Sequence, residues 1–317
     1  MILSFSNIQL KTLCSTSRLI FGYHKQAFTS LRGFSGMAQQ ITRENAEEIL
    51  QNIDNFLFDC DGVLWDGNGP IKGSLETVLR LKELGKQVFY VTNNSSQTRD
   101  HYVKKCSNYG YSVKRDEILC TAWIAAEYLR AANFKDKVYV MGREESVGAE
   151  LDAVGIKYTG PGVRCVLVAF DPHINYTKLI RAASYLKKPD CLYLATNEDS
   201  AFPSTNPNLA IPGTGCMVVP VSLASGREPI VMGKPAPNMF EVLRKVHNID
   251  PSRCMMIGDR LDTDILFAKN CGMQSTLVLS GISTIDDVQR PAETTAGAVD
   301  MQPDFYAENL AGLGMFI

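Results

Sequence analysis

The chain has 317 residues, of which 45% are hydrophobic and 21% charged, and its formal net charge is −2. This composition predicts one large or two medium-sized globular domains, and the near-neutral charge argues against nucleic acid as a partner. No apolar run reaches the roughly 18 residues of a membrane span, so no membrane partner is expected. The nine cysteines form no C-x-x-C pair and the four histidines no ligand cluster, which argues against a disulfide scaffold and a zinc site.

The first 43 residues contain no Asp or Glu. They carry five Lys or Arg residues among many Ser and Thr residues, which is the composition of a mitochondrial presequence. The segment Arg32-Gly33-Phe34-Ser35 also looks like a presequence cleavage site. The composition of residues 1–36 therefore predicts a mitochondrial location for the protein. The alternatives are an unstructured tail, or a cytoplasmic form that starts at Met37.

Strands and helices alternate over the next part of the chain. The helical patterns fall at 42–51, 73–84, 97–109 and 121–133. The apolar runs of buried strands fall at 56–58 and 87–91. This β-α-β order predicts parallel strands joined by right-handed crossovers.

The alternation restarts at about residue 136. Further strands are predicted at 138–141, 163–170, 191–195, 229–232, 254–257 and 275–279, and a helix at 177–186. Between them, residues 197–215 are rich in Asn, Pro, Ser and Gly, and a loop of that length is either disordered or functional.

These elements predict an α/β fold with a doubly wound, Rossmann-like parallel sheet as its core. The predicted core domain consists of residues 44–134 and 229–317. A cap domain, itself α/β, is predicted as an insertion at residues 135–228.

Polar side chains follow four of the apolar strands. They are Asp59 and Asp61, Thr92 and Asn93, Lys234, and Asp259 with Asp264. The carboxyl ends of parallel strands share one edge of a sheet, so these side chains are expected to converge there. Phosphoryl transfer needs an in-line nucleophile, a metal ion and fixed donors around the phosphate oxygens. The set of residues therefore predicts phosphoryl transfer with Mg²⁺, which prefers oxygen ligands.

Each of these residues has an expected role. Asp59, at the strand tip, is the predicted nucleophile. Asp61 projects from the same side of the chain and is the predicted acid and base, protonating the leaving alcohol and later deprotonating water. Lys234 supplies positive charge to the phosphate and to Asp59.

The remaining polar residues complete the predicted site. The Thr92 hydroxyl and the amides of Asn93 and Asn94 are predicted to bind the phosphate. Asp259 completes the magnesium site, and Asp264 is either a further ligand or an anchor behind the ligands.

The order of these motifs resembles the haloacid dehalogenase superfamily, namely D-x-D-G at residue 59, T-N-N at 92, G-K-P at 233 and G-D-x-x-x-T-D at 258. The chain is similar to the phosphatases of that superfamily that carry a large α/β cap between the second and third motifs. The resemblance implies that Asp59 is nucleophile and metal ligand. It also implies that Asp61 binds the metal through its backbone carbonyl, that Asp259 is the third protein ligand, and that the protein pairs into a homodimer through its caps.

Within the superfamily, the chain resembles the eukaryotic phosphoglycolate (glycerol-3-phosphate) phosphatases and the pyridoxal phosphatases, historically called 4-nitrophenylphosphatases. Pyridoxal phosphatases tend to have a His where Phe202 stands, and Asp171-Pro172-His173 also resembles the phosphoglycolate type. A small phosphorylated metabolite, 2-phosphoglycolate or glycerol 3-phosphate, is therefore the expected substrate.

Other functions remain as alternatives. A pyridoxal 5′-phosphate phosphatase or a phosphoprotein phosphatase would use the same four motifs. A dehalogenase is disfavoured because it needs no acid or base at Asp61. A non-catalytic binding protein is disfavoured because none of the four motifs is lost.

Overall fold

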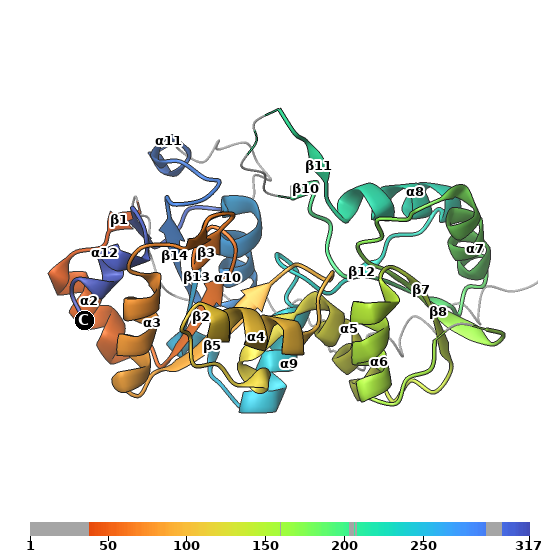
Figure 1. Cartoon of the computed structure of the whole chain (residues 1–317), viewed down its shortest axis with the longest axis horizontal. Helices are drawn as coiled ribbons and strands as arrows, with labels where there is room; N and C mark the ends of the chain where they lie inside the picture. Colours follow the sequence, from red (N-terminus) through yellow and green to blue (C-terminus); the bar gives the residue numbers. More distant parts are fainter. Residues whose placement is uncertain (1–37, 159, 203–205, 207, 290–299) are drawn as a thin grey trace, which may run out of the picture. The chain divides into compact units, whose positions relative to one another are not determined.

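The computed structural model describes residues 38–158, 160–202, 206, 208–289 and 300–317 (Figure 1). Residues 1–36, predicted as a presequence, lie outside the described residues. Met37–Ile317 form one compact unit. Among the described helices, none combines the length and hydropathy that crossing a membrane requires.

The larger sheet contains seven parallel strands in the order β1-β15-β14-β13-β2-β5-β6. Their bounds, in that order, are Gln39–Gln40, Phe305–Ala307, Gln274–Val278, Cys254–Gly258, Asn55–Asp59, Gln87–Thr92 and Ile118–Cys120. Strand β2 lies between β13 and β5, so the chain order reverses next to it, as in doubly wound sheets. This arrangement confirms the predicted α/β fold with a parallel core sheet.

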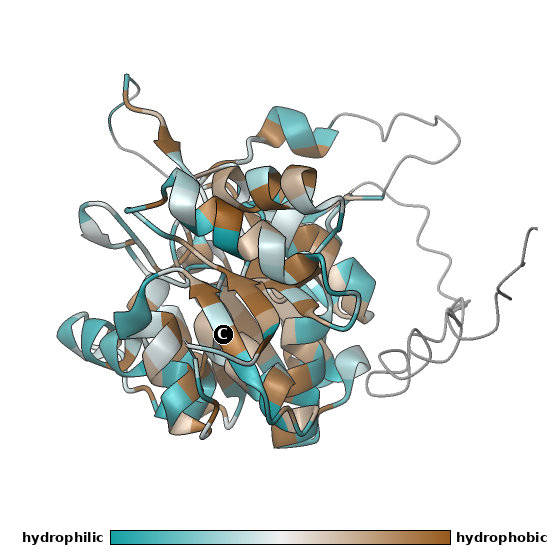
Figure 2. Ribbon diagram, turned by 90° about the vertical axis from the view of Figure 1, so that its right-hand side faces the viewer, coloured by the Kyte–Doolittle hydropathy of each residue, from teal (hydrophilic) through white to brown (hydrophobic). Residues whose placement is uncertain are grey.

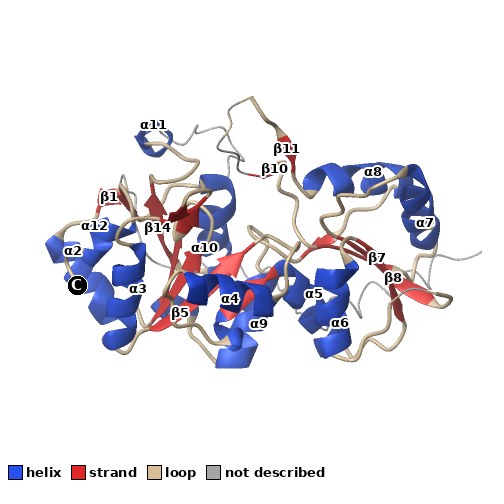
Figure 3. Cartoon of the chain, in the orientation of Figure 1, coloured by secondary structure: helices blue, strands red, loops and turns tan. Residues whose placement is uncertain are grey.

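Helices flank this sheet (Figure 3). Their bounds are Arg43–Asn52 (α2), Ser74–Glu83 (α3), Arg99–Asn108 (α4), Thr121–Ala131 (α5), Asn238–His247 (α9), Leu266–Cys271 (α10), Ile285–Gln289 (α11) and Leu310–Gly314 (α12). Phe56, Leu57 and Phe58 of β2 are fully buried. Consecutive residues of a strand point to opposite faces, so both faces of the sheet are covered at this point. Figure 2 shows that hydrophobic residues, in brown, gather on strands in the interior of the molecule and hydrophilic residues on many of the helices around them.

A second sheet has four parallel strands in the order β12-β9-β8-β7. Their bounds are Ile230–Val231, Leu192–Ala195, Val163–Val168 and Lys137–Met141. Helices α6 (Ala149–Ala153), α7 (Tyr176–Leu186) and α8 (Gly215–Ser225) belong to this part of the chain. The predicted polar loop contains a short antiparallel pair, β10 (Ala201–Phe202) with β11 (Ile211–Pro212).

The strand predicted at 229–232 does not belong to the core sheet. It forms β12, which pairs with β9 at the edge of the four-stranded sheet. The expectation that all four polar strand ends belong to one sheet is therefore wrong for the strand before Lys234. An apolar run predicts a strand but not its partner, because pairing is decided by distant residues. The limits of the predicted core and cap domains stay a prediction.

A buried ion pair connects helix α4 with helix α6. Glu150 is 1% exposed and accepts hydrogen bonds from the backbone N–H and the Nη2 of Arg99, both at 3.0 Å. The Arg99 guanidinium carbon lies 4.4 Å from the centre of the Trp123 ring. Removing one member of such a pair leaves the other charge buried without its partner.

We expect Glu150→Ala to lower the free energy of unfolding by about 3–5 kcal/mol, because Arg99 would stay buried and lose its carboxylate. Urea unfolding monitored by circular dichroism measures this change. The control is Glu145→Ala, whose side chain is 80% exposed and whose loss should change the free energy by less than about 0.5 kcal/mol. Equal unfolding midpoints for the two variants would contradict the stabilising role of the Arg99–Glu150 ion pair.

Candidate active site

The structure brings three of the predicted acidic residues together at the carboxyl ends of β2 and β13. Asp59 is the last residue of β2, Asp259 follows β13 directly, and Asp264 lies in the turn η4 (Leu261–Ile265). One carboxylate oxygen from each of them lies within 4.8 Å of the others. In the part of the chain that the structure describes, this is the one such group of three potential metal ligands.

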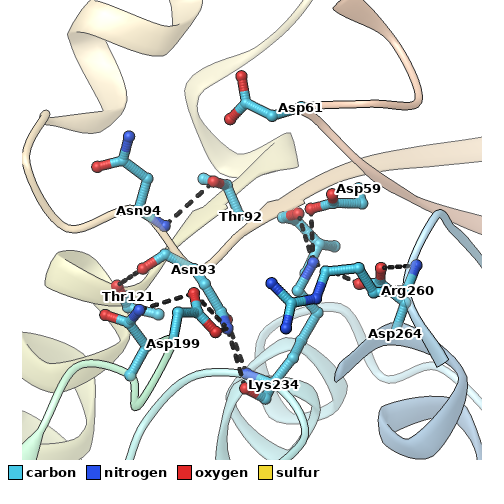
Figure 4. A network of polar contacts seen from close by, with 12 residues as sticks. Asp59, Asp61, Thr92, Asn93, Asn94, Thr121, Asp199, Lys234, Arg260 and Asp264 are labelled. Atoms are coloured by element: carbon cyan, nitrogen blue, oxygen red, sulfur yellow. Dashed lines mark hydrogen bonds and ion pairs between the residues drawn. The ribbon is translucent and has the colours of Figure 1, made fainter. Parts of the chain in front are cut away.

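Lys234 joins this cluster from the loop after β12. Its ammonium donates a hydrogen bond to Asp59 Oδ1 at 2.6 Å and pairs with Asp264 Oδ1 at 2.7 Å (Figure 4). The Lys234 side chain is 3% exposed and that of Asp264 is 1% exposed. The ammonium therefore lies between two carboxylates in a buried site, as the charge of a buried lysine requires.

Burial and mutual repulsion shift the ionisation of these acids. Burial raises the pKa of Asp59 well above its usual value, Asp264 and Asp259 add to the increase, and Lys234 opposes it. Burial and the charge of Asp264 raise the pKa of Asp259 to about 7. Burial alone would lower the pKa of Lys234, but Asp264 and Asp59 raise it above its usual value.

The site therefore contains more negative charge than Lys234 balances. Three carboxylates face one ammonium, and two of the carboxyl groups have raised pKa values. A divalent cation would offset this excess, and carboxylate oxygens are the ligands that hard cations prefer. The residues present fit a divalent metal ion.

Glycines allow the chain to approach Asp259 closely. Its Oδ2 accepts a hydrogen bond from the Ile282 N–H at 2.8 Å. A Cβ atom on Gly281 would overlap this oxygen, and one on Gly62 would lie 2.6 Å from it. Gly62 also has φ +88°, which side chains disfavour. Only glycine fits these two positions while Asp259 keeps its orientation.

The loop after β5 contains the predicted phosphate-binding residues. Thr92 is 3% exposed, and its hydroxyl accepts a hydrogen bond from the Asn94 N–H at 3.2 Å. Asn94 Oδ1 in turn accepts from the Ser96 N–H at 2.8 Å. These contacts form a tight turn at the end of β5, and phosphate binding by Thr92 and Asn94 stays a prediction.

The Asn93 side chain contacts the backbone of Lys234 and the carboxylate of Asp199. Its side-chain Oδ1 accepts from the Lys234 backbone N–H at 2.8 Å, and its Nδ2 donates to the Lys234 carbonyl at 2.9 Å. Nδ2 also donates to the Asp199 carboxylate at 3.2 Å (Figure 4). The side-chain amide of Asn93 is thus hydrogen-bonded to Lys234 and Asp199, and phosphate binding by Asn93 stays a prediction. The T-N-N motif alone contains no signal for this, because both partners are more than 100 residues away.

Asp61 lies apart from the cluster of three carboxylates. Its side chain is 40% exposed, and its Oδ1 accepts a hydrogen bond from the Trp65 indole N–H at 2.9 Å. The Lys105 ammonium lies 3.8 Å from the same oxygen and 4.4 Å from the centre of the Trp65 ring. The motif pattern predicts neither contact, although the spacing of four residues between Asp61 and Trp65 permits the first.

We expect Gly281→Ala to weaken the binding of a divalent cation about tenfold or more, because the new Cβ would displace the Asp259 carboxylate. Isothermal titration calorimetry with MgCl₂ measures this affinity. The control is Gly312→Ala in α12, where the new Cβ would meet only Ala307, at 3.2 Å. Unchanged Mg²⁺ affinity in a folded Gly281→Ala variant would contradict the role of this close approach.

Known proteins resemble this chain over most of its length. A family model described as haloacid dehalogenase-like hydrolase matches residues 56–157, and a related HAD-hydrolase-like model matches residues 231–313. Glycerol-3-phosphate phosphatase from Gallus gallus is 40% identical over an aligned length of 299 residues, and the match covers 87% of this chain and 95% of that protein. Chronophin from Rattus norvegicus is 38% identical and covers 84% of this chain and 88% of its own length.

A solved structure shares the fold. The 4-nitrophenylphosphatase from Thermotoga maritima has a TM-score of 0.76 and 31% sequence identity, over 84% of this chain and 98% of that one. The chain therefore belongs to the haloacid dehalogenase-like hydrolases, and it is a phosphatase.

Proposed function

We propose that this phosphatase hydrolyses small phosphate monoesters with Mg²⁺, through an aspartyl-phosphate formed on Asp59. The observation that carries the proposal is the environment of Asp59. Its carboxylate lies at the tip of β2, 2.6 Å from the Lys234 ammonium and within 4.8 Å of oxygens of Asp259 and Asp264. A nucleophilic carboxylate, a fixed cation and a metal site are thus close enough to act on one phosphoryl group.

The metal would be held by the Asp59 and Asp259 carboxylates and the backbone carbonyl of Asp61. When bound, the cation neutralises charge on the phosphate and allows the carboxylate to approach it. Asp264 is engaged differently, because its carboxylate pairs with Lys234 and accepts from the Arg260 N–H at 3.1 Å. These contacts support the role of Asp264 as an anchor for Lys234.

The first chemical step transfers the phosphoryl group to the protein. An Asp59 oxygen attacks phosphorus in line with the ester oxygen, and the bond between phosphorus and that oxygen breaks. The ester oxygen takes the electron pair and accepts a proton from the Asp61 carboxyl group, so the alcohol leaves neutral. Lys234 stabilises the negative charge on the equatorial phosphate oxygens.

The second step releases phosphate. A water molecule attacks the phosphorus of the acyl phosphate while the Asp61 carboxylate accepts a proton from it. The bond between phosphorus and the Asp59 oxygen breaks, which regenerates the Asp59 carboxylate. Asp61 is again protonated, so both residues return to their starting states.

We expect Asp59→Asn to reduce turnover by about 10⁴-fold or more, because an amide oxygen is a poor nucleophile toward phosphorus. Steady-state release of inorganic phosphate measures turnover, and circular dichroism checks that the variant is folded. Near-normal turnover in the folded variant would show that another residue is the nucleophile.

We further propose 2-phosphoglycolate or glycerol 3-phosphate as the substrate. Support comes from the resemblance of residues 171–173 and 197–203 to the phosphoglycolate type and from the name of the Gallus gallus relative. The ring of Phe202 packs edge-on against Phe170, with ring centres 5.0 Å apart. Pyridoxal 5′-phosphate is the second candidate, because the four motifs resemble those of the pyridoxal phosphatases as well.

A comparison of substrates tests this choice. We expect kcat/KM to be at least about tenfold higher for 2-phosphoglycolate or glycerol 3-phosphate than for pyridoxal 5′-phosphate or a phosphopeptide. Each assay is run with Mg²⁺ and repeated with EDTA, which should remove activity until Mg²⁺ is restored in excess. A preference for the pyridoxal ester would reject the proposed substrate, and full activity in EDTA would reject the metal.

Location and assembly are proposed on separate grounds. The composition of residues 1–36 supports a mitochondrial location, which imaging of the full chain and of a form starting at Met37 would check. Identical cytosolic distributions would contradict it. The family resemblance supports a homodimer, and a monomeric mass by light scattering would reject that assembly.

A further inference from the structure

The loop that follows β9 reaches the active site through one carboxylate. Asp199 accepts hydrogen bonds from Asn93 Nδ2, at 3.2 Å to Oδ1 and 3.3 Å to Oδ2, and from Asn197 Nδ2 at 2.8 Å. Asn197 is itself 1% exposed, so its amide holds the carboxylate from a buried position. None of the roles assigned so far uses Asp199.

Asp199 and the Lys234 backbone together favour one orientation of the Asn93 amide. With Nδ2 toward Asp199, the amide presents its oxygen to the Lys234 N–H and its second N–H to the Lys234 carbonyl. The reversed amide would point its oxygen at a carboxylate and its NH₂ group at another N–H donor. Both contacts would be repulsive, so the charge of Asp199 adds to the preference that the Lys234 backbone sets for the observed orientation.

The selected orientation holds Lys234 in place. The Asn93 side chain forms hydrogen bonds with both the N–H and the carbonyl group of Lys234, while the Lys234 ammonium donates a hydrogen bond to Asp59 at 2.6 Å. Figure 4 shows Asp199, Asn93, Lys234 and Asp59 as a continuous series of contacts. Lys234 follows an edge strand of two residues, so strand pairing alone fixes its backbone weakly.

The backbone of Asp199 is also fixed. Its carbonyl accepts a hydrogen bond from the Gly215 N–H at 2.9 Å, at the start of helix α8. A Cβ atom on Gly213 would overlap the Asp199 carbonyl, so the two ends of the loop pack without space for a side chain there. The backbone that carries the Asp199 carboxylate is therefore held in place.

We propose that Asp199 is a positioning residue for the phosphoryl half of the reaction, acting through Asn93 on Lys234. This inference rests on the proposed function, because it concerns the same site. It assigns to the loop a role separate from the choice of alcohol. Loss of Asp199 should slow the hydrolysis of every phosphate ester by the same factor, because Lys234 would contact the phosphoryl group that all of them share.

The test compares Asp199→Ala with Glu198→Gln. Glu198 is the neighbouring residue of the same loop, carries the same charge and is exposed. We expect Asp199→Ala to lower kcat/KM roughly 10- to 100-fold, the size expected for lost bonds to a charged group. The factor should be equal for 2-phosphoglycolate, glycerol 3-phosphate and 4-nitrophenyl phosphate. The affinity for inorganic phosphate, measured by calorimetry, should fall as well, and Glu198→Gln should leave both quantities unchanged.

A double-mutant cycle tests whether Asp199 acts through Asn93. We expect the Asn93→Ala, Asp199→Ala double variant to be no more impaired than Asn93→Ala alone, because the second change removes a contact that is already lost. Independent effects that multiply would overturn the proposed route through Asn93.

Three further outcomes would also overturn the inference. In the first, the loss of kcat/KM in Asp199→Ala differs between the esters, which would make Asp199 a specificity residue. In the second, the melting temperature of the variant falls while its kinetics stay unchanged, which would make the residue purely structural. In the third, the affinity for inorganic phosphate is unchanged. Phosphate affinity is measured without turnover. Absence of turnover in the wild-type protein would therefore contradict the proposed function and still leave this inference to be judged by binding.

Discussion

The buried ammonium of Lys234 is the interaction on which the rest of the site depends. It lies 2.6 Å from an Asp59 oxygen and 2.7 Å from an Asp264 oxygen, and it is 3% exposed. A lysine buried this deeply keeps its charge only with carboxylate partners, and those carboxylates are stabilised by the same contact. The end of β2, the loop after β12 and the turn η4 must therefore come together for any of the three charges to be buried.

The ion pair between Lys234 and Asp59 joins residues that lie at or just after the ends of strands of different sheets. Lys234 follows β12, which pairs in the four-stranded sheet, whereas Asp59 ends a strand of the seven-stranded sheet. Asn93 joins them, because it extends from the end of β5 and binds both backbone groups of Lys234. The site is consequently assembled from both sheets, and a change at the contact between them alters the position of the Lys234 charge relative to Asp59.

The acidic residues carry a second constraint, which is unbalanced negative charge. Burial raises the pKa of Asp59 and of Asp259, and Lys234 offsets only part of the repulsion. Gly281 and Gly62 let the backbone come close to the Asp259 carboxylate and hold it toward the cluster. Repulsion among these carboxylates favours the binding of a cation. The bound cation would in turn attract an anionic substrate, so the two can bind together.

The α/β alternation, the apolar strand at residues 56–58 and the acids that follow it can be predicted from the sequence. These are local signals, because buried strands are continuous apolar runs and acids at their ends need a compensating partner. Three other features depend on how the chain packs: β12 joins the smaller sheet, the Asn93 amide faces Lys234, and Asp199 and Lys105 contact Asn93 and Asp61. These contacts depend on side-chain orientation and on partners up to 141 residues away. Neither periodicity nor motif spacing specifies such pairings, because they form only when separate elements pack together.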